Sequence, residues 1–223
     1  MKNISIVIRN KNESRWIGHA IQSCLDNFFE PELIIINNQS SDESMEIVRS
    51  FRHNNALEPS IHNYCELVTA NIDNYTPGKA LNMGIKLAKN KFICIISAHT
   101  VIKKFDSEYI LSNLKDFPCI FGKQIPIYRG KKITPRYIWS HFLDKDVVNM
   151  YSQLEGRYFL HNAYAIYTKD ILEEYPFDEE LSGKEDRLWA GKLIEEGKKI
   201  LYTPRMEAEH HFTTAGNTWK GVG

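Results

Sequence analysis

Hydrophobic residues in this chain gather in short runs, each followed by a polar loop and then by apolar residues at helical spacing. Residues 4–8 are rich in isoleucine and valine and end in the polar segment 9–13, after which apolar residues recur at helical spacing through 16–25. The runs at 33–36 and 92–96 are of the same kind. Runs that are apolar at every position are typical of strands buried on both faces. The pattern therefore predicts an α/β fold, with a mostly parallel sheet and helices on both of its faces.

The second half of the chain is less regular. Prolines interrupt mixed segments beyond residue 104, and residues 137–158 are polar and aromatic, so we expect an irregular, substrate-facing region there. Regularity returns with a helix predicted from 187 to 196, closed by Gly197 as its C′ residue. A short strand is predicted at 199–202.

The composition fits one globular domain and excludes several classes of protein. Of 223 residues, 43% are hydrophobic and 25% are charged, which excludes a disordered chain. Lys plus Arg equal Asp plus Glu at 28 each, so there is no excess positive charge to attract nucleic acid. The four cysteines lie far apart, which favours neither a zinc knuckle nor a disulfide framework and fits a reducing, cytoplasmic setting. The apolar start of the chain is too short for a signal peptide or a membrane span, so we expect any membrane contact to be peripheral, at the inner face.

Polar residues follow three of the predicted strands, at the point where each strand ends. These polar segments are residues 9–13, 37–42 and 97–100. The loops at the carboxyl ends of parallel strands line the ligand crevice of an open α/β sheet. We therefore expect the three segments to form a binding site.

Four segments of the chain resemble family 2 glycosyltransferases of the GT-A fold. They are residues 4–13 (ISIVIRNKNE), 36–42 (INNQSSD), 78–84 (GKALNMG) and 185–189 (EDRLW). Each segment alone is weakly specific, whereas their order and spacing together make a specific pattern that extends to about residue 212.

The resemblance implies one GT-A domain with a Rossmann-like, mostly parallel sheet over residues 1–223. Residues 1–104 would form its nucleotide-binding half, and residues 105–223 its acceptor-binding and catalytic half. The implied activity is transfer of a sugar from a nucleotide-sugar donor to an acceptor hydroxyl, usually with inversion, in the synthesis of bacterial-type surface polysaccharides or glycoconjugates. The implied acceptor is a glycan or a lipid-linked glycan. A non-catalytic module of the same fold that binds a nucleotide sugar or a glycan is the alternative.

Asp186 resembles the catalytic base of the family, and Glu185 is its neighbour. Sugar transfer needs a carboxylate that accepts the proton of the attacking hydroxyl, held near the N-terminus of a helix. The residues alone leave open that both acids only begin a helix, where the helix dipole favours negative charge. The resemblance favours Asp186 as the base.

The donor-binding residues implied by the resemblance lie in the first half of the chain. Asn10 and Asn38 occupy the positions of a Thr and an Asp that contact the nucleobase in the family, and as amides they suit more than one base. Lys79 would replace the charge of an Arg that is common where this chain has Leu81. A turn role for Asn38 and a solvated strand-end charge for Arg9 are the alternatives. The expected donor contacts are Arg9, Asn10, Asn12, Glu13, Asn38, Lys79, Asn82, Ser97 and His99.

The Asp-x-Asp triplet that holds a divalent metal in the family is replaced here by Ser97-Ala98-His99. A subset of family 2 sequences looks similar at this triplet, so the replacement does not imply an inactive enzyme. By resemblance, His99 and His210 are the candidate ligands of Mn or Mg, and His211 is the register alternative to His210. Because Mg²⁺ prefers oxygen ligands, a second interpretation stays open, in which His99 hydrogen-bonds a phosphate or the donor sugar without a metal.

Other nucleotide-binding enzymes fit the sequence less well, and the acceptor contacts are harder to predict. Dehydrogenases and P-loop enzymes need a glycine-rich phosphate loop, but the turn after Ile8 has no glycine before Gly18. A nucleotidyltransferase needs a basic, glycine-rich loop near its N-terminus, and none is present. Aromatic residues at high density are more often core than site. The candidate acceptor contacts are Trp139, His141, Tyr151, Tyr158, His161, Asn162 and Trp189.

Overall fold

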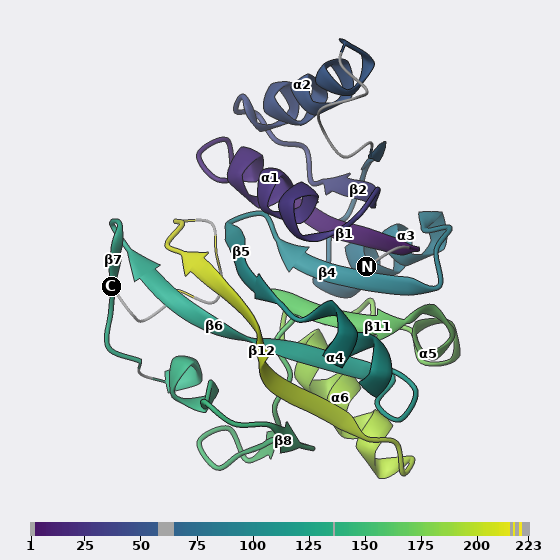
Figure 1. Ribbon diagram of the computed structural model, residues 1–223, viewed down its shortest axis with the longest axis vertical. Coiled ribbons are helices and arrows are strands. Elements are labelled where there is room, and N and C mark those ends of the chain that lie inside the picture. Colours follow the sequence, from purple (N-terminus) through teal and green to yellow (C-terminus); the bar gives the residue numbers. More distant parts are fainter. Residues whose placement is uncertain (1–2, 58–64, 136, 215, 217–218, 220–223) are drawn as a thin grey trace.

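One twisted sheet runs through the part of the protein described by the computed structural model, which covers residues 3–57, 65–135, 137–214, 216 and 219 (Figure 1). The strand order along its main path is β3-β2-β1-β4-β11-β6-β12-β5. Strands from both halves of the chain therefore belong to the same sheet, and they meet where β4 pairs with β11.

The first half of the chain forms a parallel unit, which confirms the prediction from its apolar runs. Its strands are β1 (Ile4–Asn10), β2 (Glu32–Asn37), β3 (Glu66–Asn71) and β4 (Phe92–Ser97). Its helices are α1 (Ile17–Asn27), α2 (Ser44–Leu57) and α3 (Pro77–Leu87). β1 lies between β2 and β4 and is parallel to both, so its polar end is flanked by the polar ends of its neighbours. The register aligns Asn10 with Asn37, and Asn37 with Asn71.

The second half is more regular than predicted. Its principal strands are β5 (Thr100–Phe105), β6 (Cys119–Tyr128), β11 (Tyr164–Thr168) and β12 (Ile200–His211). β11 is antiparallel to β4 and β6, whereas β12 is parallel to β6 and antiparallel to β5. A strand begins where one was predicted at 199–202, but the predicted length is too short, because β12 continues to His211. In this extension the buried Met206 and Ala208 alternate with the half-buried Glu207 and Glu209, so it contains no apolar run.

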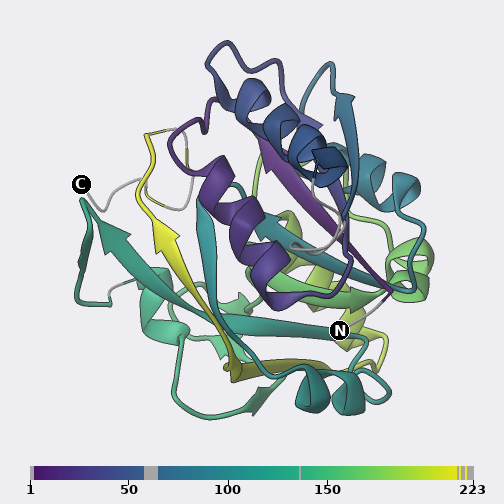
Figure 2. The same cartoon turned by 45° about the horizontal axis from the view of Figure 1, so that its top comes forward.

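Helices cover both faces of the sheet, as predicted. Ile6 and Ile8 of β1 belong to one core cluster together with residues of α1 and α2, whereas Val7 belongs to a second cluster with residues of α3 and α6. Figure 2 shows α1 and α2 lying together across the first face. The remaining helices are α4 (Ser107–Asn113), η1 (Tyr137–His141), α5 (Lys169–Glu174) and α6 (Glu185–Glu195). The remaining short strands are β7 (Lys131–Lys132), β8 (Val147–Val148), β9 (Tyr151–Ser152) and β10 (Arg157–Tyr158).

Both ends of α6 are marked by a distinctive backbone conformation. Lys184, directly before the helix, has a left-handed backbone with φ of 63°. At the other end the Gly197 N–H donates to the carbonyl of Ile194 (2.9 Å) and the Lys198 N–H to that of Leu193 (3.1 Å). These two bonds form a Schellman motif, which confirms Gly197 as the C′ residue.

Within the described residues, no helix has the length and apolar character needed to cross a membrane.

Candidate active site

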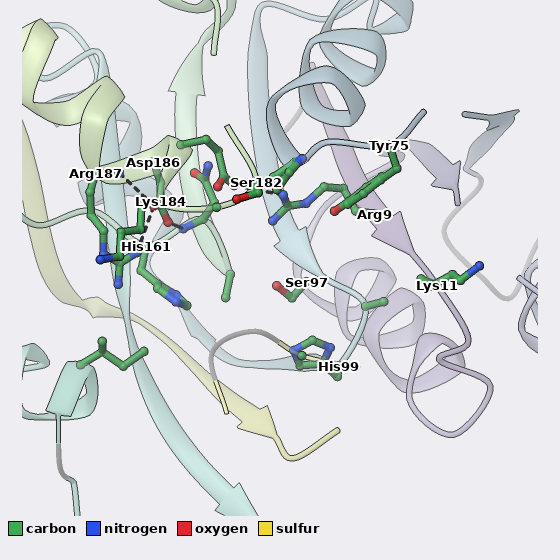
Figure 3. A pocket seen from close by; sticks show the side chains of 18 of the residues that line it. Arg9, Lys11, Tyr75, Ser97, His99, His161, Ser182, Lys184, Asp186 and Arg187 are labelled. Carbon is green, nitrogen blue, oxygen red and sulfur yellow. Dashed lines mark hydrogen bonds and ion pairs between the residues drawn. The ribbon is translucent and has the colours of Figure 1, made fainter. Parts of the chain in front are cut away.

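A cleft of about 790 Å³ opens where the carboxyl ends of β1 and β4 meet the start of α6. Figure 3 shows Arg9 and Tyr75 across the opening from Asp186, Arg187 and His161. The residues predicted as site residues that line the cleft are Arg9, Asn10, Glu13, Ser97, His99, Glu185 and Asp186. The sequence segments 9–13, 97–99 and 185–186 therefore converge on one cavity, although they lie far apart along the chain.

An ion pair connects the two sides of the cleft. Arg9, at the end of β1, lies 3.0 Å through Nη1 from Oε1 of Glu185, in the first turn of α6. Burial raises the pKa of Glu185, although the charge of Arg9 opposes this shift. The prediction that Arg9 lies at the site is consistent with this position, but the side chain is paired with Glu185 rather than solvated.

Asp186 is held in a fixed orientation by hydrogen bonds to both of its oxygens. Oδ2 accepts a bond from the backbone N–H of Asn162 (3.1 Å), and Oδ1 accepts bonds from the Arg187 N–H (2.8 Å) and Nη1 (3.0 Å). Burial alone would raise the pKa of this carboxyl, but the charge of Arg187 and the Asn162 N–H lower it below its usual value. Asp186 is therefore ionised at neutral pH and has lone pairs left to accept a proton.

A chain of hydrogen bonds runs through the predicted histidine pair. His99 Nδ1 lies 3.1 Å from Oε1 of Glu13, and His210 Nδ1 lies 2.8 Å from Oε1 of Gln124. The Nε2 atoms of the two histidines face each other at 3.0 Å. His210 does not itself line the cleft and reaches it through His99. Burial lowers the pKa of His210, so its imidazole is neutral.

The β2 loop lies behind the cleft rather than along it. Asn38 donates its backbone N–H to the carbonyl of Asn10 (2.9 Å), and Asn12 Oδ1 accepts from the Ser41 N–H (2.8 Å). The Asn10 amide donates to Ser44 Oγ (2.9 Å) at the start of α2. Neither Asn12 nor Asn38 lines the cleft, so in the structure both residues hold the β1 loop in place.

Lys79 and Asn82 also lie outside the cleft lining and attach α3 to neighbouring segments. Asn82 Nδ2 donates to the carbonyl of Phe177 (2.8 Å), while its Oδ1 accepts from the Phe177 N–H (3.0 Å). Lys79 Nζ donates to the carbonyl of Asp73 (3.3 Å). Asn82 thereby fixes the segment that leads towards α6, rather than facing the cavity itself.

Several cleft residues were not predicted. Lys184 and Arg187 flank the acidic pair in the sequence. Two cationic side chains beside a candidate base are a sequence signal that could have identified them as site residues. Glu155 and Tyr75 have no local pattern that marks them. Each is brought to the cleft by a loop whose course depends on tertiary structure.

The candidate acceptor contacts divide into two groups. His161 and Asn162 line the cleft. Trp189 is 4% exposed and donates its indole N–H to the carbonyl of Tyr175 (2.6 Å), so it is a core residue. The others that do not line the cleft are Trp139, His141, Tyr151 and Tyr158.

Comparisons with known proteins agree with this fold. The chain is 31% identical over 119 residues to the poly-beta-1,6-N-acetyl-D-glucosamine synthase of Staphylococcus epidermidis, a match that covers 53% of this chain and 27% of the relative. The corresponding synthase of Staphylococcus aureus is 27% identical over 120 residues, with the same coverage. The chain thus spans only about a quarter of the length of these relatives.

Two solved structures share the fold at low sequence identity. S. aureus TarS 1–349 in complex with UDP-GlcNAc superposes with a TM-score of 0.73 at 18% identity, covering 98% of this chain and 61% of that one. A mannosyltransferase from Pyrobaculum calidifontis, in complex with GDP-Man and Mn²⁺, superposes with a TM-score of 0.66 at 15% identity, covering 96% and 58%. The sequence model of glycosyl transferase family 2 matches residues 5–176, which is most of the chain, and the protein therefore belongs to that family.

Proposed function

We propose that the protein transfers a sugar from a nucleotide-sugar donor to a hydroxyl of a glycan or lipid-linked acceptor, with inversion, in the synthesis of a surface polysaccharide or glycoconjugate. The observation that carries this proposal is the buried Asp186 carboxyl group, held in a fixed orientation in the same cleft as the ends of β1 and β4. TarS, whose fold is similar, was crystallised with UDP-GlcNAc, and the curated relatives are polysaccharide synthases.

The proposed reaction is a single displacement. Asp186 accepts the proton of the acceptor hydroxyl as its oxygen attacks the anomeric carbon, and the nucleoside diphosphate leaves from the opposite face, which inverts the configuration. Arg9 and Lys184 line the same cleft and supply positive charge for the leaving diphosphate. Ser97 at the end of β4 and His99 just after it line the same cleft, and we assign both to contact with the donor.

The residues present fit a divalent cation whose coordination shell is completed by the donor. The bond to the Glu13 carboxylate places a proton on Nδ1 of His99, whereas the Gln124 amide can accept a bond from Nδ1 of His210 or donate one to it. When both imidazoles carry their proton on Nδ1, the two Nε2 lone pairs face each other at 3.0 Å, and a cation bound beside them by both nitrogens would relieve their repulsion. Among the described residues, no group of three or more His, Cys, Asp or Glu side chains could hold a metal, so phosphate oxygens and water would supply the other ligands. We propose His99 and His210 as ligands of a Mn²⁺-like ion, which accepts nitrogen more readily than Mg²⁺ does. This ion would neutralise the departing diphosphate.

Binding of Mn²⁺ is therefore expected to depend on the nucleotide. Electron paramagnetic resonance should detect bound Mn²⁺ in the presence of the preferred nucleoside diphosphate and little without it. His210→Ala should weaken this binding by about tenfold or more, since one of two protein ligands is lost. His141→Ala, a histidine outside the cleft, is the control. Equal Mn²⁺ binding by wild type and His210→Ala would exclude this site.

The proposed function itself is tested by a donor screen. A true donor at a hundredfold its Kd should stabilise the fold by about 2.7 kcal/mol, which is measured as a thermal shift across UDP-, dTDP-, GDP- and CMP-sugars. Donors that bind are then assayed for transfer and for slow hydrolysis, with and without EDTA. Binding of a donor without any turnover would contradict the enzyme and identify a binding module.

The cellular setting follows from the same proposal. All four cysteines are buried and free, which fits a reducing compartment. We place the reaction in the cytoplasm, with peripheral contact at the inner membrane face where the acceptor is lipid-linked. The Ser97-Ala98-His99 triplet would assign the chain to a subset of the family that has this motif in place of Asp-x-Asp.

A further inference from the structure

The side chain of Arg187 bonds to two carboxylates of the cleft at once. Its Nη1 donates to Oδ1 of Asp186 (3.0 Å), and its Nε lies 3.2 and 3.0 Å from the two carboxylate oxygens of Glu155. Arg187 Nη1 is also 3.4 Å from the carbonyl of Leu160, and its guanidinium carbon is 4.9 Å from the ring centre of Phe159. With 8% of its side chain exposed, Arg187 is fixed between the candidate base and the turn that joins β9 to β10.

This arrangement makes two acids share one cation. A guanidinium does not lose its proton in a protein, so its charge is present at every working pH. The more closely Arg187 interacts with Asp186, the more the carboxylate is stabilised and the weaker it becomes as a base. Glu155, in the turn between β9 and β10, binds the Nε side of the same guanidinium. The basicity of Asp186 therefore depends on a residue 31 positions earlier in the chain, with which it has no direct hydrogen bond.

The other charged or titratable groups around Asp186 do not replace Arg187. Arg9, from β1, is bonded to Glu185, the neighbour of Asp186 on α6. Burial lowers the pKa of His161 to about 3, so this imidazole is neutral at working pH. Burial raises the pKa of the Tyr167 hydroxyl on β11, so it is neutral as well. Among the described residues, Arg187 is the cation that forms an ion pair with Asp186.

We propose that Arg187 is a positioning residue that orients Asp186 and sets its basicity, and that Glu155 limits this effect by competing for the guanidinium. The proposal rests on the proposed function, since it concerns the base of that reaction. Because Glu155 lies in the turn between β9 and β10 and lines the cleft, it links the strength of the base to the position of that turn.

The test is the pH profile of kcat/KM, whose acid limb reports the ionisation of the base in the free enzyme. Arg187→Met removes the cation, so the acid limb should move to higher pH by about one to three units. Arg187→Lys keeps the charge without the fork and should restore part of this shift. Glu155→Gln keeps the shape of the side chain without its charge. Asp186 is then the only carboxylate that pairs with the Arg187 guanidinium, so the acid limb should move to lower pH. kcat should change more than KM for the donor.

Arg205→Met is the matched control, because it removes an arginine that pairs with Asp106 away from the cleft. Its acid limb should coincide with that of wild type. The donor affinity and melting temperature of every variant are measured to separate a folding defect from a change at the base. If Arg187→Met does not fold, the pH profile of Glu155→Gln alone decides the test. An unchanged acid limb in Glu155→Gln, or a shift to higher pH, overturns the proposal. If wild type transfers no sugar at all, the proposed function has failed instead.

Discussion

Asp186→Asn is expected to lower the rate of sugar transfer by about two to four orders of magnitude while leaving donor affinity nearly unchanged. The amide has the size of the carboxylate and keeps an oxygen for the bonds from Arg187, although its NH2 group replaces the oxygen that accepts the Asn162 N–H. The amide cannot accept the proton of the attacking hydroxyl, which is the role that we propose for the carboxylate. Steady-state kcat and KM together with calorimetric donor binding measure the two effects separately.

Glu185→Gln is the matched control, because it changes the adjacent carboxylate in the same way. Glu185 is bonded to Arg9 on the opposite side of the cleft, so its loss should mainly affect the binding of the donor phosphates. Because the amide in Glu185→Gln no longer neutralises Arg9, we expect donor KM to fall and kcat to fall less than in Asp186→Asn. Transfer by Asp186→Asn at a rate close to that of wild type would remove the carboxylate from the role of base.

The parts of the fold that the sequence predicts are those where burial leaves a local pattern. β1, β2 and β4 are apolar at nearly every position because helices cover both of their faces. β6 contains Gly122 and Pro126, and the latter half of β12 alternates between buried and half-buried residues. Gly122 is needed there because a Cβ would lie 2.7 Å from that of Met206 on β12, a contact that depends on tertiary pairing. Such strands have no apolar run, and the sequence therefore predicts an irregular half in their place.

The sequence likewise predicts some residues of the candidate site and misses others. Arg9, His99 and Asp186 lie at the ends of recognisable elements, and all three line the cleft. Asn38 and Asn82 lie in comparable segments but bond to neighbouring backbone away from the cavity. Their distance from the cleft depends on loop geometry within a few ångströms, which residue spacing does not specify. Glu155 enters the site only because the guanidinium of Arg187 and the β9–β10 turn come together in three dimensions.

Gly78→Ala is expected to destabilise the protein by about 3 kcal/mol and to reduce transfer as well. A Cβ at Gly78 would lie 2.0 Å from the backbone oxygen of Asp178, so α3 and the segment 177–179 would have to separate. This movement strains the bonds from Thr76 Oγ1 to the carbonyl of Glu179 (2.6 Å) and between Asn82 and Phe177. Urea denaturation measures the loss of stability, and kcat measures the effect on the site.

Activity is affected because the displaced segment continues into the cleft. Ser182, Gly183 and Lys184 line it, and α6 with Asp186 follows directly. Gly191→Ala is the matched control, since a Cβ there meets nothing within 4 Å. In the interior of α6, alanine should stabilise the fold by about 0.5–1 kcal/mol relative to glycine. Glycine to alanine is thus expected to destabilise the protein at Gly78 and to stabilise it at Gly191. An unfolding midpoint and a kcat equal to those of wild type in Gly78→Ala would show that the contact between α3 and residues 177–179 does not fix the position of the base.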